Sequence, residues 1–132
     1  MNRSSFRTLA LATCSVAAVS LFASSGLAQA SDTCADAPVI GNGSFAFDLN
    51  GSTNDGNSPC QFPANGPDVW YRFNATGNGI VTVSTCGNST FDTMLAAYDG
   101  CGGTQLACLD DFCGLQTQIS FTVATGDRKS VV

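Results

Sequence analysis

The sequence predicts a small all-β fold, an antiparallel β-sandwich of the jelly-roll kind linked by disulfide bonds. Three observations lead to this prediction. Apolar and polar residues alternate wherever the pattern is clear, no stretch after residue 30 carries a sustained helical stripe, and glycine recurs every several residues. Period-two patterning with frequent turn residues is typical of a two-layer β domain.

Residues 1–30 predict a secretory signal peptide that is cleaved before Ser31. Arg3 and Arg7 precede an apolar segment over Leu9–Phe22. The A-x-A sequence Ala28-Gln29-Ala30 fits a cleavage site. A membrane anchor is disfavoured, because Ser and Thr interrupt the segment and it falls short of the roughly 20 apolar residues that span a bilayer. We therefore expect a secreted or cell-surface protein with no membrane span after cleavage.

The chain has seven cysteines, and loss of Cys14 with the signal leaves six. An even number in a secreted chain predicts disulfides. Zinc is disfavoured because the spacings match no C-x-x-C pair and the chain has no histidine. The sequence alone does not determine the connectivity, but nearness along the chain favours the pairs Cys34 with Cys60, Cys86 with Cys101, and Cys108 with Cys113.

Six strands are expected in one domain over residues 31–126. Alternating patterns predict half-buried strands at Phe45–Leu49, Val69–Phe73 and Ile119–Val123. More continuous apolar runs predict central strands at Ile80–Val83 and Met94–Tyr98, and a hairpin across residues 100–103 would return along Thr104–Cys108. Residues 127–132 carry dense charge and little strand pattern, so we expect them to be an aberrant or truncated tail.

The charge pattern and the missing histidines exclude several function classes. All ten acidic residues are Asp and the net charge is −5, which disfavours nucleic acid as a partner. A chain without histidine has no Ser-His-Asp triad and no Cys-His pair. A hydrolase that uses an Asp pair is the remaining enzymatic alternative. Asp110 and Asp111 fit it poorly, because neighbours on an extended segment point to opposite sides.

Calcium is the cofactor that the acidic residues favour. We expect the carboxylates of four residues to converge at one end of the hairpin over residues 91–114: Asp92, Asp99, Asp110 and Asp111. Hard oxygen ligands from several loops suit this ion, and it would brace the loops. The alternative is that these residues are solvated turn formers, since Asp is common in turns and no EF-hand spacing is present.

Aromatic residues are candidates for a ligand-binding platform, and the set comprises Trp70, Tyr71, Phe62 and Tyr98. Tyr71 lies on the apolar face of its predicted strand and is expected in the core. Trp70 shares the opposite face with Arg72 and is expected to be exposed, so it is the candidate ligand-binding residue. The alternative for Trp70 is ordinary packing.

Two segments, residues 66–73 (GPDVWYRF) and 91–114, resemble the prepeptidase C-terminal (PPC)-like domains of secreted bacterial multidomain proteins, as does the strand GIVTVSTCG at 79–87 between them. The resemblance spans residues 34–125. It implies a compact non-catalytic β-sandwich that serves secretion, substrate adhesion or matrix binding. The chain has Leu109 where this family usually has Asn, and residues 127–132 replace two final strands, so the resemblance implies a sandwich that lacks its last two strands.

These observations together predict a secreted non-catalytic module for adhesion, which binds an extracellular polysaccharide or protein surface and holds a structural calcium ion. An inert structural spacer, or a truncated remnant of a larger surface protein, is the first alternative.

Overall fold

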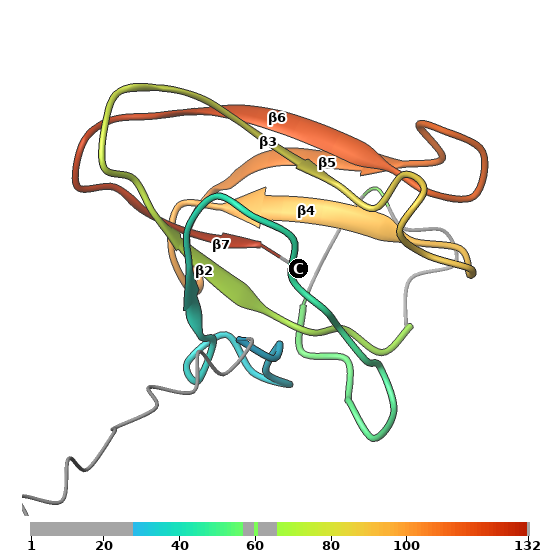
Figure 1. Ribbon diagram of the computed structural model, residues 1–132. Helices are drawn as coiled ribbons and strands as arrows, with labels where there is room; N and C mark the ends of the chain where they lie inside the picture. The colour runs from blue at the N-terminus through green and yellow to red at the C-terminus, as the bar shows by residue number, and fades with distance from the viewer. Residues whose placement is uncertain (1–27, 57–59, 61–65, 132) are drawn as a thin grey trace, which may run out of the picture.

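The computed structural model describes residues 28–56, 60 and 66–131, and these residues form the all-β fold that the sequence predicts (Figure 1). No helix occurs in these ranges, and so none there is long and apolar enough to cross a membrane. Most of the predicted signal peptide, residues 1–27, lies outside the described residues, as does Phe62.

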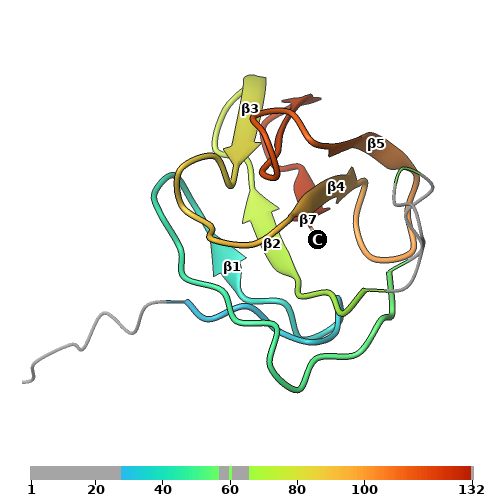
Figure 2. The same cartoon turned by 90° about the vertical axis from the view of Figure 1, so that its right-hand side faces the viewer.

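The strands form two sheets. The larger sheet has the order β1-β2-β7-β4-β5, with the bounds β1 Val39–Ile40, β2 Tyr71–Asn74, β7 Arg128–Val131, β4 Met94–Tyr98 and β5 Gln105–Asp110. The smaller sheet pairs β3 Gly79–Ser84 with β6 Gln118–Val123. Figure 2 shows the larger sheet from β1 to β5, with β3 lying over it. The arrangement is that of a small β-sandwich.

Most strand pairs are antiparallel, and β1 alone among the named strands runs parallel to its partner, β2. The β3–β6 ladder is regular from Gly79 opposite Val123 to Ser84 opposite Gln118. In the β4–β5 ladder the register shifts between Ala97 and Tyr98. Strand β7 joins the two halves of the larger sheet, because it pairs with β2 on one side and with β4 on the other.

Strand β4 is buried on both of its faces, and the small side chains Ala96 and Ala97 are both 0 % exposed. On one face, Ala96 and Tyr98 pack with the N-terminal segment and Trp70 in a cluster made of Cys34, Ala37, Trp70, Ala96 and Tyr98. On the other face, β4 packs against the smaller sheet in a cluster made of Leu95, Ala97, Ile119 and Phe121. The two clusters form the core on either side of one strand.

Two expectations about strands are wrong. Residues 45–49 form no strand, although Phe45, Phe47 and Leu49 are half-buried and alternate with exposed neighbours as the pattern indicated. Residues 128–131 do form a strand, β7, because the backbone pairs with β2 and β4 despite its charged sequence. The resemblance to PPC-like domains also implies that two final strands are missing, and this stays a prediction.

The six cysteines form three disulfides, but none of the expected pairs occurs. The bonds join Cys34 with Cys101, Cys60 with Cys108, and Cys86 with Cys113, with Cα–Cα distances of 5.6, 5.9 and 6.0 Å. Nearness along the chain misled because each bond joins two segments that the folded sheets bring together. Cys108, for example, packs against the cluster around Trp70, whereas Cys113 follows the turn after β5 and meets Cys86 beyond the end of β3.

Peptide mapping of the oxidised protein without reduction tests this connectivity. We expect linked peptides that join Cys34 to Cys101 and Cys86 to Cys113. Replacing both Cys86 and Cys113 with Ala should lower the free energy of unfolding by about 3 kcal/mol, because the unfolded chain loses a constraint on a loop of intermediate length. A peptide that links Cys108 to Cys113 would contradict the structure.

Candidate functional site

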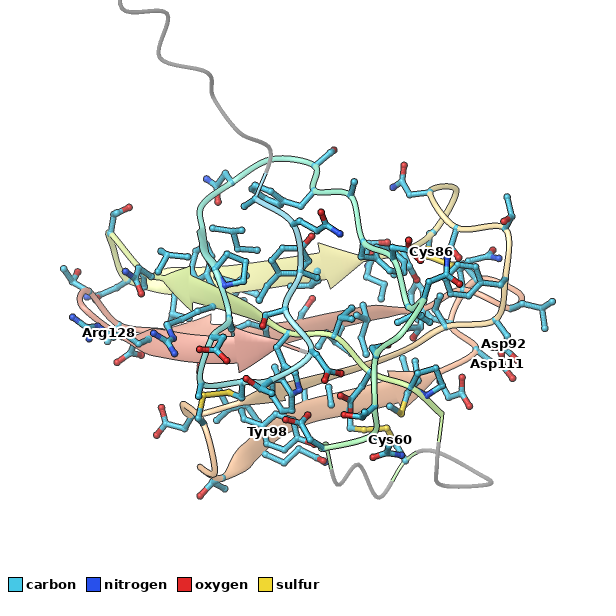
Figure 3. The ribbon with its side chains drawn as sticks, turned by 90° about the horizontal axis from the view of Figure 1, so that it is seen from below. Cys60, Cys86, Asp92, Tyr98, Asp111 and Arg128 are labelled. Carbon is cyan, nitrogen blue, oxygen red and sulfur yellow. A yellow bond between two sulfur atoms is a disulfide. The ribbon has the colours of Figure 1, made fainter. Side chains whose placement is uncertain are left out.

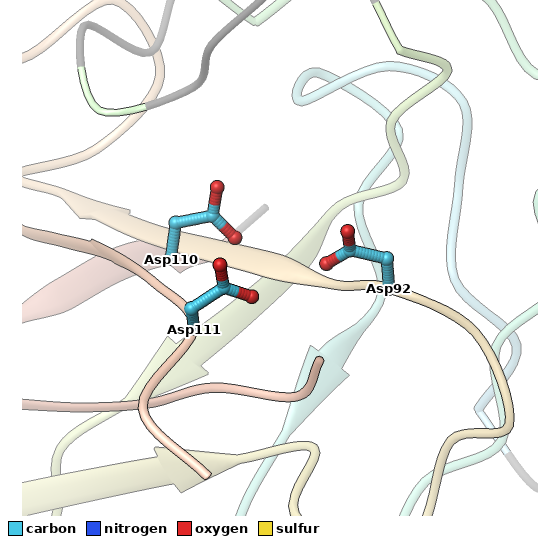
Figure 4. A group of neighbouring side chains, drawn as sticks. All are labelled: Asp92, Asp110 and Asp111. Atoms are coloured by element: carbon cyan, nitrogen blue, oxygen red, sulfur yellow. The ribbon is translucent and has the colours of Figure 1, made fainter. Parts of the chain in front are cut away.

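Three carboxylates gather at one end of the β4–β5 hairpin. Oxygen atoms of Asp92, Asp110 and Asp111 lie within 4.8 Å of one another (Figure 4). Asp92 lies just before β4 and Asp110 ends β5, and the ladder places Met94 opposite Asp110, so the pairing of the two strands brings these carboxylates together. The structure therefore brings together three of the four carboxylates that the sequence singles out.

Asp111 joins the cluster because its backbone leaves the extended conformation. Its φ is 54°, in the left-handed region that Asp tolerates better than most residues. The expectation that Asp110 and Asp111 point to opposite sides is therefore wrong, since it assumed an extended segment. Figure 4 shows both side chains directed toward Asp92.

Asp99 does not belong to this cluster, contrary to expectation. It follows Tyr98 and so lies beyond the opposite end of β4 from Asp92. There its backbone N–H donates to the carbonyl of Thr104 at 2.8 Å, which closes the turn between β4 and β5. Residues at the two ends of one strand cannot converge, and the predicted set of four is reduced to three.

A buried threonine network holds the backbone beneath the cluster. Thr85 Oγ1 and Thr93 Oγ1 are 2.6 Å apart, and the N–H of Thr117 donates to Thr85 Oγ1 at 3.0 Å. Thr117 Oγ1 in turn donates to the carbonyl of Leu109 at 3.2 Å. The network ties together the end of β3, the start of β4, the end of β5 and the approach to β6. It positions Asp92 and Asp110 independently of any ion, and the sequence patterns did not reveal it.

The three carboxylates of the cluster repel one another electrostatically. Burial raises the pKa of Asp110, and the neighbouring charges of Asp111 and Asp92 raise it further. Asp92 and Asp111 are exposed. Arg128 lies at the opposite end of the molecule, so it does not offset these charges (Figure 3). Oxygen ligands that repel one another in this way suit a hard divalent cation such as calcium.

A cleft of about 950 Å³ begins at Asp92, the one member of the three carboxylates that lines it. Its walls come from residues 40–49, β2, β3 and residues 88–95. Two ring contacts cross it: Phe45 lies 5.9 Å from Tyr71, and Phe47 meets Phe91 edge to face at 5.8 Å. The Tyr71 hydroxyl donates to the carbonyl of Ala46, and burial raises the pKa of Tyr71. The segment 45–49 is thus held against the sandwich by aromatic packing.

Polar groups and one accessible aromatic ring form the end of the cleft nearest the carboxylates. Phe91 is 42 % exposed and immediately precedes Asp92. The loop that carries it is ordered by its own hydrogen bonds, because the Phe91 N–H donates to Ser89 Oγ at 3.3 Å and Asn88 Nδ2 donates to the Cys86 carbonyl at 3.3 Å. Phe91 is not among the aromatic residues that the sequence favours for ligand binding, although it directly precedes Asp92 in the chain.

Trp70 is buried, and the expectation that it is exposed is wrong. Only 5 % of it is accessible, its ring lies 5.6 Å from that of Tyr98, and its Nε1–H donates to Asp55 Oδ1 at 2.5 Å. The face that Trp70 shares with Arg72 is covered by the N-terminal segment, and Arg72 Nη2 donates to the Cys34 carbonyl at 3.2 Å. Trp70 is therefore a core residue and cannot serve as a surface platform.

A second pair of carboxyls, Asp55 and Asp68, lies beside Trp70. Asp68 Oδ2 accepts from the Gly56 N–H at 2.7 Å, while its buried Oδ1 has no donor among the described residues. Burial, followed by the neighbouring Asp55, raises the pKa of Asp68 from 3.8 to about 6. A proton on this pair supplies the missing donor, so Asp68 is the carboxyl most prone to be neutral in the folded protein.

Residues 30–126 match a T9SS-associated family described as galactose binding domain-like. The chain belongs to this family. In the same comparisons, no curated protein and no solved structure matches this chain. Membership of the galactose binding domain-like family agrees with a small β-sandwich, while the likeness to PPC-like domains stays a prediction.

The Asp55–Asp68 pair predicts a pH dependence. Folded Asp68 keeps its proton up to about pH 6, whereas unfolded Asp68 releases it near 3.8, so the folded state binds more protons between these values. The contribution of this group to stability therefore falls as pH rises through that window. Asp68→Asn, which keeps an acceptor for Gly56, should remove this fall and raise the melting temperature at neutral pH by a few degrees.

Fluorescence of the single tryptophan, Trp70, reports on the same pair because its indole bonds Asp55. We expect its emission to titrate near pH 6 in the unmodified protein and to lose this step in Asp68→Asn. Asp36→Asn, at an exposed position, is the control. A titration step near pH 6 that persists in Asp68→Asn would refute the assignment.

Proposed function

We propose that this chain is a secreted, non-catalytic module that binds extracellular carbohydrate through the end of the cleft around Phe91. The observation that carries the proposal is the accessible ring of Phe91. This residue lies on an ordered loop and directly precedes Asp92, one of the three grouped carboxylates. Membership of the galactose binding domain-like family supports carbohydrate as the ligand class. The predicted signal peptide and the T9SS association of the family support a secreted or cell-surface location.

The chemistry of the two groups is complementary to a sugar. The face of an aromatic ring packs against the C–H face of a pyranose, and carboxylate oxygens accept hydrogen bonds from its hydroxyls. Fixed polar groups beside an apolar surface are typical of small-molecule sites. Phe91 would supply the packing surface and Asp92 the first acceptor. Adhesion to a matrix polymer, as PPC-like domains imply, is the finer form of this proposal.

A hydrolase is the less favoured alternative. Glycoside hydrolysis uses two carboxyls that act from either side of the scissile bond, with their roles separated by environment. Here the three carboxylates lie within 4.8 Å of one another, only Asp92 of the three lines the cleft, and no histidine is present in the chain to assist them. The grouping favours binding of a cation or of sugar hydroxyls over acid–base chemistry.

Affinity electrophoresis in gels that contain soluble galactan tests carbohydrate binding. Phe91→Ala should weaken the affinity for galactan by about two- to tenfold, since packing against an aromatic ring contributes about 0.5 to 1.5 kcal/mol. Phe112→Ala, an exposed phenylalanine that does not line the cleft, is the matched control and should leave retardation unchanged. Melting curves check that each variant folds.

Failure of the unmodified protein to bind galactan or any polysaccharide on a glycan array would overturn the proposal and favour an inert spacer. Equal losses in both phenylalanine variants would place the binding surface elsewhere.

We also propose that Asp92, Asp110 and Asp111 hold a structural calcium ion. The support is the convergence of three oxygen ligands on a braced backbone, together with their uncompensated charge. Such an ion would relieve the repulsion that raises the pKa of Asp110. It would also fix the position of Asp92 beside Phe91.

Thermal melting with calcium and with chelator tests the ion. A site with a dissociation constant of roughly 0.1 mM gains about 2.7 kcal/mol at about 10 mM calcium, which raises the melting temperature by roughly 10 °C. Asp110→Asn should abolish this response, and Asp99→Asn, at the other end of β4, should preserve it. Identical melting temperatures in calcium and chelator would refute the proposal.

A further inference from the structure

Strand β3 has a hydrogen-bonding partner on one edge only, since among the described residues it pairs with β6 alone. The Thr85 N–H donates to the Thr117 carbonyl at 2.9 Å, in register with the ladder. Because antiparallel pairs alternate, Val81 and Val83 also direct their backbone groups to β6. The backbone N–H and C=O groups of the intervening residues, Ile80, Thr82 and Ser84, therefore point away from β6.

This open edge borders the cleft. Residues 81–85 line the cleft, and the side chains of Val81 and Val83 pack half-buried against the core cluster of Leu95, Ala97, Ile119 and Phe121. The edge lacks the features that normally prevent strand pairing, because β3 reads Gly-Ile-Val-Thr-Val-Ser, without proline or charge. Six residues in this conformation span about 20 Å.

The acidic residues around the cleft favour a basic peptide over a second copy of this chain as the partner of the β3 edge. Asp68 and Asp92 line the cleft, and within the part of the chain that the structure describes no Lys or Arg is among the lining residues. A second copy of this chain would bring its own net charge of −5 to an acidic cleft, which disfavours self-pairing. An extended segment that carries both apolar and basic residues is complementary to this cleft. Its backbone can pair with the edge of β3, its apolar side chains can pack beside Val81 and Val83, and its basic side chains can approach Asp68 or Asp92.

We propose that the β3 edge binds an extended segment of another polypeptide, which adds a strand to the smaller sheet. Backbone hydrogen bonds to Ile80, Thr82 and Ser84 hold this segment. Its alternate apolar side chains enter the cleft beside Val81 and Val83, and a Lys or Arg at its end approaches Asp92. The segment would share the cleft and Asp92 with a bound carbohydrate, so the two ligands would compete, but the proposal does not depend on carbohydrate binding.

The probe is a labelled peptide of sequence Lys-Val-Thr-Val-Thr-Val-Lys with blocked ends, titrated by fluorescence polarisation with the oxidised protein in the absence of sugar. We expect saturable binding. The same peptide with proline in place of its second Thr should bind at least tenfold more weakly, because in an added antiparallel strand the Thr residues lie opposite hydrogen-bonding residues of β3 and donate their N–H groups to it. A peptide with Glu in place of both Lys residues should also bind more weakly, because Asp92 and Asp68 repel it.

Two matched protein variants separate docking from folding. Thr82→Pro removes an N–H that points away from β6 on the open edge, where proline is tolerated. Ser120→Pro removes the corresponding N–H from the residue opposite Thr82 on β6, and Ser120 does not line the cleft. Both variants lose the hydroxyl contact of 2.9 Å between Thr82 and Ser120, so they carry similar structural costs.

We expect Thr82→Pro to weaken peptide binding at least tenfold and Ser120→Pro to leave it within twofold, with similar melting temperatures. Equal binding by the two variants, or no binding by the unmodified protein, overturns the proposal. Sedimentation velocity provides a further arm: a dimer that forms without peptide and is lost in Thr82→Pro would assign the edge to a second copy and also overturn it.

Discussion

Burial of β4 on both faces is the constraint on which the rest of the structure depends. Its residues Ala96 and Ala97 are fully inaccessible, and they face different partners: Trp70 and the N-terminal segment on one side, Ile119 and Phe121 on the other. Small side chains allow both layers to approach the strand closely. A larger side chain at either position would overpack one cluster, which typically costs about 1 to 3 kcal/mol.

The geometry of the candidate site follows from this central strand. The end of β4 that carries Asp92 is paired with the end of β5 that carries Asp110, and the threonine network around Thr85 fixes both against β6. The other end of β4 leads to the turn with Asp99 and to the bond between Cys101 and Cys34. Figure 3 shows the separation, with Asp92 and Asp111 together and Tyr98 away from them. One end of the hairpin carries the carboxylates of the candidate site, and the other end is fixed to the N-terminal segment by a disulfide bond.

Local pattern predicted much of the fold. Alternation of apolar residues located most strands, because half-buried strands impose a period of two on the sequence. Long-range pairing was not accessible in this way. The disulfide partners depend on which loops the sheets bring together, and β7 is a strand because β2 and β4 present edges to it, in spite of its own residues. Phe45–Leu49 shows the converse, since it has the alternation of a strand but pairs with no other strand.

The candidate site was predicted in part for the same reason. Asp92 and Asp110 were identifiable as strand-end carboxylates, whereas the inclusion of Asp111 required a left-handed backbone that residue type alone permits but does not dictate. The exposure of Trp70 was predicted wrongly because Arg72, on the same face of the strand, suggested contact with solvent. The N-terminal segment covers that face instead. The open edge of β3 is a property of topology, and single strands give no sign of it.

Hydrogen–deuterium exchange of the oxidised protein, resolved to single amides, tests the central claim most directly. We expect the slowest exchange in β4, at Leu95, Ala96 and Ala97, because their backbone is covered on both faces and paired within the sheet. Rapid exchange is expected at Ile80, Thr82 and Ser84 on the open edge of β3. Fast exchange throughout β4, or protection of these three β3 amides in the protein alone, would contradict the structure described above.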